Sequence, residues 1–428
     1  IAKFKILTDN SPFHATLFLS SRRNEDGYLI GKGDISNYLI MPGEDINIDF
    51  NRDKRTFTGK GAELFEAQYK IEGTDKDQRI LNNDQYGYLK SDPEKWLKEK
   101  DSLLKVQLDL LAVYQSKITP LAYSIMRADV IGLNRGSVYL ALSFTPPFLA
   151  VRKDLTKELT DVYAQLEKSP AYIDLNDRAC LSPKYTFYLY EKIKLEVKHD
   201  RVILNTNPRS DLYYFPKISK DFKGILRDKL LACWIMDVAS VNNLEPEYAT
   251  DALAEMQTPS FINIVNRLKT ANQKGQQVAD FDFKDSKGQT VHLADFKGKV
   301  MIVDMWFTGC EVCQRVAAGL PHIEDKFKDR SDIIFVSISI DRNKEKWLNS
   351  INKKEGKYYI TSTTKYLYTA GTGEKNQFIQ EYVPSGSYPS MLIIDKEGKL
   401  FSSTPTHPLN TETQQALVSE INKALASK

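Results

Sequence analysis

Residues 300–313 read VMIVDMWFTGCEVC, an apolar run that leads into two cysteines with two residues between them. A run this apolar predicts a strand that is buried on both faces of a sheet. The residues after it predict a helix, with Cys310 at its N-terminus and Cys313 one turn further in. We therefore expect Cys310 to be exposed at the positive end of the helix dipole and Cys313 to be shielded beside it.

The spacing of the two cysteines suits thiol–disulfide exchange. A Cys310 thiolate would attack a substrate disulfide to form a mixed disulfide, and Cys313 would then attack Cys310 to release the reduced product. Two alternatives are a zinc half-site and a pair of structural thiols. Zinc takes four ligands, and the five histidines are scattered along the chain. The sequence thus predicts no metal, and no cofactor beyond the redox-active disulfide Cys310–Cys313.

A peroxiredoxin is the nearest competing enzyme. It would need a threonine three residues before the reactive cysteine and a proline before that threonine. Here Thr308 lies two residues before Cys310, and the proline is missing. The motif therefore disfavours a peroxidatic thiol.

Strands and helices alternate on both sides of the motif. The expected elements are a hairpin at residues 281–293, strands at residues 333–340, 391–394 and 399–401, and a closing helix at residues 411–424. Apolar strands that alternate with helices indicate an α/β layer sandwich, which we place over residues 275–428.

The preceding sequence has a different pattern and is separated from this domain by a polar segment at residues 271–277. We predict a small β-rich domain over residues 1–62 and a mostly helical region over residues 63–270. The expected strands include residues 4–7, 38–41 and 46–50, and the expected helices include residues 156–166, 185–197, 225–241 and 247–268.

Composition limits the possible functions. The chain has 428 residues, enough for two or three domains, and 42% of them are hydrophobic. Its 59 basic and 56 acidic side chains give a net charge of +3. That charge is too small to indicate a nucleic-acid partner. No apolar run approaches the roughly 20 residues that span a bilayer. The chain starts at Ile1 rather than Met, so we expect a mature or trimmed form, and a missing targeting segment says little about location.

Four cysteines are too few for a disulfide-stapled scaffold. Cys233 lies in an apolar helical stretch and is most simply a small core residue. Cys180 precedes an expected helix start. In an oxidising compartment the two could also form a structural disulfide, and the sequence leaves both interpretations open.

Residues 275–428 resemble the thioredoxin-like disulfide reductases of the TlpA and ResA type. The likeness rests on the C-x-x-C motif, on Trp306 in the strand before it, on the hairpin at residues 281–293, and on Tyr388-Pro389 ahead of an apolar strand. It implies a thioredoxin-like α/β domain with a cis-proline at Pro389 beside the disulfide. It also implies that Trp306, Tyr388 and Pro389 bind substrate, with Tyr388 offering backbone hydrogen bonds. The alternative for Pro389 is an ordinary turn proline.

Asp304 matches the buried acid that many thioredoxins carry six residues before the first cysteine. A carboxylate desolvated in an apolar strand should have a raised pKa, which suits it to accept a proton from Cys313. We therefore count Asp304 with Cys310 and Cys313 as catalytic. The alternative is an acid at a strand end that reaches solvent.

Three residues depart from the family pattern. Val312 replaces a proline that helps to set the redox potential, so the direction of exchange stays open. Glu311 would oppose ionisation of Cys310 if it pointed inward, although a solvated position is the simpler expectation. Ala318 stands where a helix proline is usual, and Pro321 follows one turn later, so the helix is expected to bend elsewhere.

Residues 41–45 and 57–62 resemble the N-terminal extension of TlpA-like proteins from Bacteroidetes. This likeness implies an exported periplasmic protein with a membrane tether absent from this chain. The leading hypothesis is a thiol–disulfide oxidoreductase, in particular a reductase of exported proteins that a membrane electron donor keeps reduced. The alternative is a protein whose helical N-terminal half captures a partner and whose redox domain is secondary or vestigial. An isomerase is a third, weaker possibility.

Overall fold

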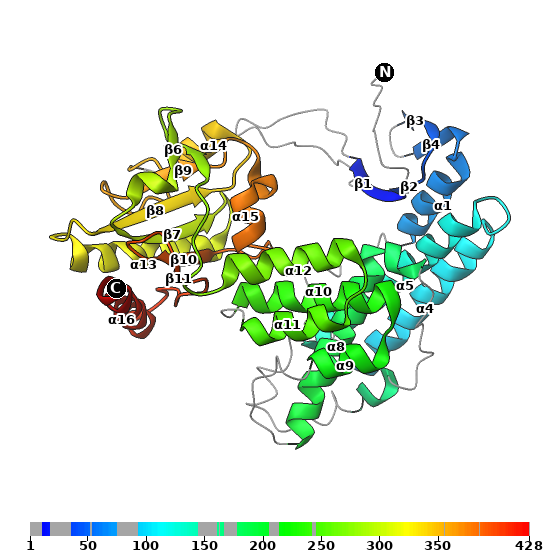
Figure 1. Ribbon diagram of the computed structural model, residues 1–428. Coiled ribbons are helices and arrows are strands. Elements are labelled where there is room, and N and C mark those ends of the chain that lie inside the picture. Colours follow the sequence, from blue (N-terminus) through cyan, green and yellow to red (C-terminus); the bar gives the residue numbers. More distant parts are fainter. Residues whose placement is uncertain are drawn as a thin grey trace. The chain divides into compact units, whose positions relative to one another are not determined.

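The structure is a computed structural model, and it describes residues 11–17, 36–51, 54–74, 93–143, 161, 163–166, 178–204, 214–241, 245–354, 356–384 and 386–427. The chain divides into two compact units, Ile1–Leu230 and Leu231–Lys428. Figure 1 labels the elements of both. The domain limits expected near residues 62 and 270 stay predictions. Among the described residues, no helix is both long enough and apolar enough to cross a bilayer.

The first unit begins with small sheets and continues as helices, which confirms the predicted order. Strands β1 (Phe13–Leu17) and β2 (Ser36–Ile40) form one antiparallel pair, and β3 (Asp45–Asn51) and β4 (Lys54–Lys60) form another. The helical elements that follow are α1 (Ala62–Gly73), α4 (Pro93–Ala112), α5 (Pro120–Ser143), η1 (Ala179–Leu181), α8 (Pro183–Leu204) and α9 (Tyr214–Asp221). The strand expected at residues 4–7 and most of the helix expected at residues 156–166 lie outside the described residues.

Helix α10 (Gly224–Val241) spans the boundary between the two units. The single helix expected over residues 247–268 is wrong, because the structure has two helices there, α11 (Pro246–Glu255) and α12 (Pro259–Asn272). Thr258 is extended ahead of Pro259, as expected of a residue whose α conformation is hindered by a following proline.

The second unit contains a seven-stranded mixed sheet in the order β11-β10-β7-β8-β9-β5-β6. Parallel pairing joins β7 to β8 and β8 to β9, whereas β10 is antiparallel to β7. The strands are β5 (Asp282–Lys284), β6 (Thr290–His292), β7 (Val300–Trp306), β8 (Ile333–Ser339), β9 (Lys365–Tyr368), β10 (Ser390–Ile394) and β11 (Leu400–Ser402). The thioredoxin-like α/β class is therefore confirmed, and β9 is a strand that was not predicted.

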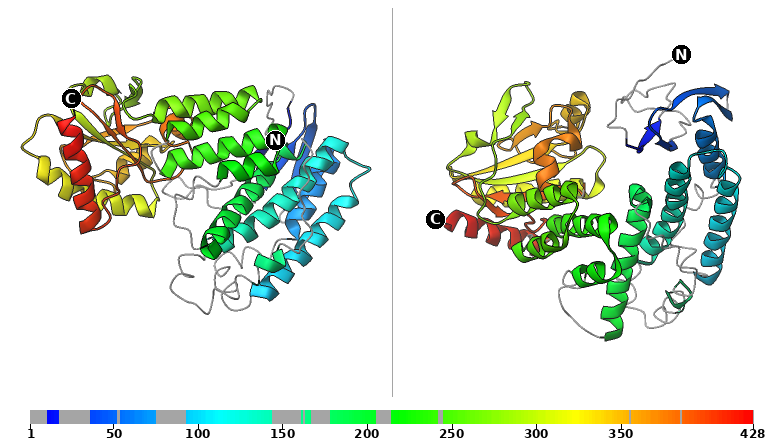
Figure 2. Two further views of the ribbon diagram at one scale, coloured as in Figure 1. Left: turned by 60° about the horizontal axis from the view of Figure 1, so that its bottom comes forward. Right: turned by 45° about the vertical axis from the view of Figure 1, so that its right-hand side comes forward.

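Helices cover both faces of this sheet, as Figures 1 and 2 show. One face packs against α13 (Glu311–Phe327) and α16 (Thr411–Ala426). The opposite face packs against α15 (Gln377–Tyr382) and the end of α12. The remaining elements are α14 (Lys344–Ser350) and the short turns η3 (Leu293–Phe296) and η4 (Gly373–Lys375). Because alternate residues of a strand face opposite sides, β7 contributes to both cores.

Candidate active site

A disulfide joins Cys310 to Cys313 where β7 ends and α13 begins. Cys310 is the N-cap residue of α13, and its sulfur accepts a hydrogen bond from the backbone N–H of Cys313 at 3.1 Å. A sulfur in this position lies at the positive end of the helix dipole, where a thiolate is stabilised. The helix-start geometry expected for the pair is therefore present.

Cys310 is less accessible than expected. Its residue surface is 8% exposed, against 2% for Cys313. Both cysteines belong to a cluster with aromatic side chains, which we call the disulfide cluster and which comprises Trp306, Cys310, Cys313, Trp347, Tyr358 and Tyr368. Several of these rings come from segments far along the chain, so the covering of Cys310 could not be read from the motif.

Trp306 is a buried member of this cluster. Its ring stacks on Tyr358 with centroids 4.1 Å apart and planes 9° from parallel. Its indole N–H donates to Ser337 Oγ at 2.7 Å. Only 1% of Trp306 is exposed, so its side chain has little surface to offer to a substrate.

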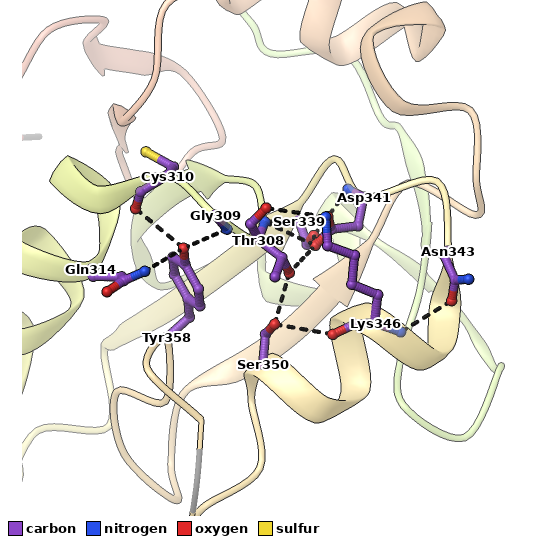
Figure 3. Close-up of polar contacts among 10 residues, drawn as sticks. All are labelled: Thr308, Gly309, Cys310, Gln314, Ser339, Asp341, Asn343, Lys346, Ser350 and Tyr358. Atoms are coloured by element: carbon purple, nitrogen blue, oxygen red, sulfur yellow. Dashed lines mark hydrogen bonds and ion pairs between the residues drawn. The ribbon is translucent and has the colours of Figure 1, made fainter. Parts of the chain in front are cut away.

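Two polar networks hold the loop between β7 and Cys310 (Figure 3). In the first, Thr308 donates to the carboxylate of Asp341 through its hydroxyl at 2.6 Å and its backbone N–H at 3.2 Å. Ser339 Oγ also donates to this carboxylate, at 2.8 Å. Lys346 Nζ donates to the carbonyl oxygen of Thr308 at 3.2 Å. The loop is therefore fastened to the end of β8 and to α14.

The second network centres on the hydroxyl of Tyr358 (Figure 3). This oxygen accepts from the backbone N–H of Gly309 at 2.8 Å and from Gln314 Nε2 at 3.0 Å. It donates to the carbonyl oxygen of Cys310 at 3.2 Å. A phenol offers one donor and two acceptor positions, so all three are used here.

Asp304 is buried in the middle of β7, and 4% of it is exposed. Its Oδ1 atom has no hydrogen-bond partner within the described part of the chain. Desolvation raises the pKa of this carboxyl to about 7. Asp304 shares a strand face with Ile302, which packs against α13, and with Trp306 of the disulfide cluster. The carboxyl therefore faces the same side as the cysteines and does not reach solvent.

Tyr388 and Pro389 lie directly ahead of β10, and the peptide bond between them is cis. Tyr388 packs against the disulfide cluster and meets Phe307 edge to face, with centroids 5.7 Å apart. Desolvation raises the pKa of the Tyr388 hydroxyl. Phe307 is 37% exposed. The structure thus brings the 388–389 segment next to the strand–helix turn.

The two residues between the cysteines point outward. Glu311 is exposed in the first turn of α13, and Val312 is 36% exposed. Glu311 is therefore in the solvated position that we expected.

Helix α13 continues through Pro321 as a single helix.

Asp341 and Tyr358 were missed in the sequence. A signal existed for Asp341, because it follows the predicted strand at residues 333–340, and the carboxyl ends of neighbouring parallel strands lie at one edge of a sheet. Tyr358 carries no comparable local signal, since it lies in a loop 48 residues from Cys310. Among the described residues, no group of three His, Cys, Asp or Glu side chains is arranged to hold a metal ion.

Residues 298–400 match the family model of thioredoxin-like proteins. An uncharacterized protein of Haemophilus influenzae is 32% identical over 133 residues, which are 30% of this chain and 79% of that protein. The thiol-disulfide oxidoreductase ResA of Bacillus thuringiensis is 24% identical over 132 residues, which are 31% of this chain and 69% of that protein. A solved thioredoxin domain of a thiol-disulfide oxidoreductase from Bacteroides vulgatus is 26% identical, covers 35% of this chain and 96% of that chain, and has a TM-score of 0.29.

Proposed function

We propose that this chain, a thiol–disulfide oxidoreductase of the thioredoxin-like family, reduces disulfides in exported proteins. The observation that carries the proposal is the disulfide at the N-terminus of α13, where the Cys310 sulfur accepts the Cys313 N–H. That position favours the thiolate once the disulfide is reduced. Cys310 is therefore the attacking cysteine and Cys313 the resolving one.

The first step joins enzyme and substrate. The Cys310 thiolate attacks one sulfur of a substrate disulfide, and the S–S bond of the substrate breaks. A mixed disulfide forms at Cys310, and the other substrate sulfur leaves with the bonding electron pair and takes up a proton.

The second step releases the product. Cys313 loses its proton and attacks Cys310 Sγ, the mixed disulfide breaks, and the substrate leaves as its second thiol. We propose Asp304 as the base for Cys313, because burial raises the pKa of its carboxyl to about 7, close to neutral pH, where a general base works best. The substrate has then gained two electrons and two protons, and the Cys310–Cys313 disulfide has formed.

Another turnover requires two electrons and two protons from a donor dithiol. We propose that this dithiol belongs to a membrane protein, and that the enzyme works in the periplasm on a membrane tether. The resemblance of residues 41–45 and 57–62 to a Bacteroidetes extension motivates this location.

For substrate binding we propose Tyr388, which packs against the disulfide cluster, and Pro389, which follows it across the cis peptide bond. Tyr388 would offer backbone hydrogen bonds to the chain that carries the substrate cysteine. Trp306 is too deeply buried to serve in the same way, so we assign it to positioning the turn beneath Cys310.

Replacing Cys313 with Ala separates this proposal from the alternative of a partner-binding protein with a vestigial redox domain. The variant keeps the attacking cysteine but cannot resolve the mixed disulfide. We expect covalent adducts through Cys310 when the reduced variant meets a disulfide-bonded protein such as insulin. A Cys310→Ala variant is the matched control. If no adduct forms under any redox condition, the exchange function is refuted.

A further inference from the structure

One side chain outside the C-x-x-C motif fixes the backbone on which Cys310 stands. The hydroxyl of Tyr358 bonds to the N–H of Gly309 and to the carbonyl oxygen of Cys310 (Figure 3). Gly309 has a φ of +104°, a region that side-chain-bearing residues rarely adopt. The Tyr358 backbone is itself fixed, because its N–H donates to the carbonyl oxygen of Ser350 at the end of α14 at 3.2 Å.

These bonds bear on sulfur chemistry because Cys310 acts through its cap position. The sulfur receives the Cys313 N–H only while the Cys310 backbone stays extended at the start of α13, with φ −77° and ψ 104°. Gln314, in the first turn of the same helix, bonds to Tyr358 as well. One oxygen thus joins the turn before the cysteine to the helix after it.

We propose that Tyr358 is a positioning residue for disulfide exchange, whose hydroxyl keeps the Cys310 sulfur aligned with the Cys313 N–H. The inference rests on the proposed exchange function and adds to it a residue that is only 3% exposed and acts through the backbone of Cys310. Without the hydroxyl, the reduced enzyme loses part of the hydrogen-bond and dipole stabilisation of its thiolate.

The ring and the hydroxyl of Tyr358 can be separated experimentally. Tyr358→Phe keeps the stack on Trp306 and removes only the oxygen. A matched control is Tyr366→Phe. Tyr366 also accepts from one backbone N–H, that of Ile360 at 2.8 Å, and donates to one backbone carbonyl, that of Thr361 at 3.0 Å. The control therefore loses two backbone bonds of the same kinds at a turn that carries no cysteine, whereas Tyr358→Phe also loses the bond to Gln314. Both rings pack in or against the disulfide cluster.

Apart from the substituted tyrosine itself, the charged and titratable groups around the disulfide are the same in both variants. They are Glu311 beside Cys310, Asp304 in β7, Asp341 and Lys346 on Thr308, and the tyrosines in or against the disulfide cluster, which are Tyr358, Tyr366, Tyr368 and Tyr388. A difference in acidity between the variants therefore reports the lost hydroxyl.

The test follows alkylation of Cys310 by iodoacetamide across pH in the reduced full chain, read by peptide mass spectrometry. We expect Tyr358→Phe to move the midpoint of the profile to higher pH. The rate of alkylation at pH 7 should fall about three- to tenfold, the range expected when the sulfur loses the one hydrogen bond from the Cys313 N–H. The rate at high pH should be unchanged. Equilibration with glutathione should favour the disulfide by a similar factor, and a tenfold change corresponds to about 30 mV. Tyr366→Phe should behave as the unsubstituted protein.

Two results would overturn the inference. One is an exchange-competent protein whose Tyr358→Phe variant keeps the same midpoint and the same glutathione equilibrium. The other is an equal change in both variants, which would indicate loss of stability alone. If the unsubstituted protein does not undergo exchange with any disulfide, that result would instead refute the proposed function on which the inference rests.

Discussion

The indole of Trp306 lies face to face on the phenol of Tyr358, with ring centroids 4.1 Å apart. Trp306 ends the strand that leads to the disulfide, and Tyr358 belongs to the loop after α14. The stack places the Tyr358 hydroxyl within hydrogen-bond distance of both Gly309 and Cys310. Packing beneath the turn and hydrogen bonding within it therefore depend on the same pair of rings.

Replacing Asp304 with Asn should slow the resolving step. The amide has the size of the carboxyl but cannot accept the Cys313 proton, so mixed disulfides should persist longer. We expect turnover of a protein disulfide at pH 7 to fall by about 10²-fold, the lower range for loss of a general base, and the inflection near pH 7 to disappear from the rate profile. An unchanged profile would exclude Asp304 as the base.

The same substitution should alter how stability depends on pH. The folded protein holds the Asp304 proton until about pH 7, whereas the unfolded chain releases it near 3.8. The contribution of Asp304 to the free energy of unfolding therefore falls as pH rises from 4 to 7 and is constant beyond that range. At about 1.4 kcal/mol for each pKa unit, the full effect is about 4 kcal/mol.

Urea denaturation at pH 4, 5.5 and 8 measures this effect. Asp304→Asn should gain stability over the unsubstituted protein as pH rises, because it carries no buried charge. Asp251→Asn, at an exposed position on α11, is the control and should follow the unsubstituted protein. A constant difference between Asp304→Asn and the unsubstituted protein at all three pH values would contradict the assignment.

Replacing Glu311 with Gln should make Cys310 more reactive. The exposed carboxylate follows Cys310 directly and opposes its ionisation, so its loss should raise the alkylation rate at pH 7 about twofold at low salt. The gain should shrink in about 1 M salt, where the Debye length is about 3 Å. Glu412→Gln removes the first-turn acid of α16 instead and should leave the rate unchanged. Equal rates for all three proteins would show that the Glu311 charge does not reach the sulfur.

Replacing Gly319 with Ala should destabilise the second unit, although alanine usually favours helices by about 1 kcal/mol. A methyl group at Gly319 in α13 would overlap the carbonyl oxygen of Pro408. Overpacking of this kind costs about 1–3 kcal/mol. Gly73→Ala in α1, where a methyl group meets nothing within 4 Å, is the control and should be neutral or stabilising. A rise in the melting temperature of Gly319→Ala would contradict the packing.

The strand, the cap and the buried acid could be predicted because they are contiguous. Residues 300–313 contain β7, the turn and the start of α13, and an apolar strand before a C-x-x-C helix has few alternative folds. Asp304 has almost no route to water from such a strand, so its raised pKa followed from the pattern. The resemblance added the cis-proline at Pro389, which no periodicity would have indicated.

Features built from distant segments could not be predicted. The covering of Cys310 depends on Tyr358, and the fastening of Thr308 depends on Asp341 and Lys346. Each is an ordinary polar or aromatic residue in its local sequence. The break between α11 and α12 was missed for another reason. The helical spacing of apolar residues continues across Pro259, but the helix itself is interrupted there.

The central claim is that Cys310 and Cys313 form a redox-active pair. The most direct measurement is an equilibrium titration of the full chain against reduced and oxidised glutathione, with the state of the Cys310–Cys313 peptide read by mass spectrometry. The account predicts one reversible two-electron transition, with a potential between about −270 and −120 mV. A pair that keeps one redox state across the whole range, with no glutathione adduct at Cys310, would contradict it.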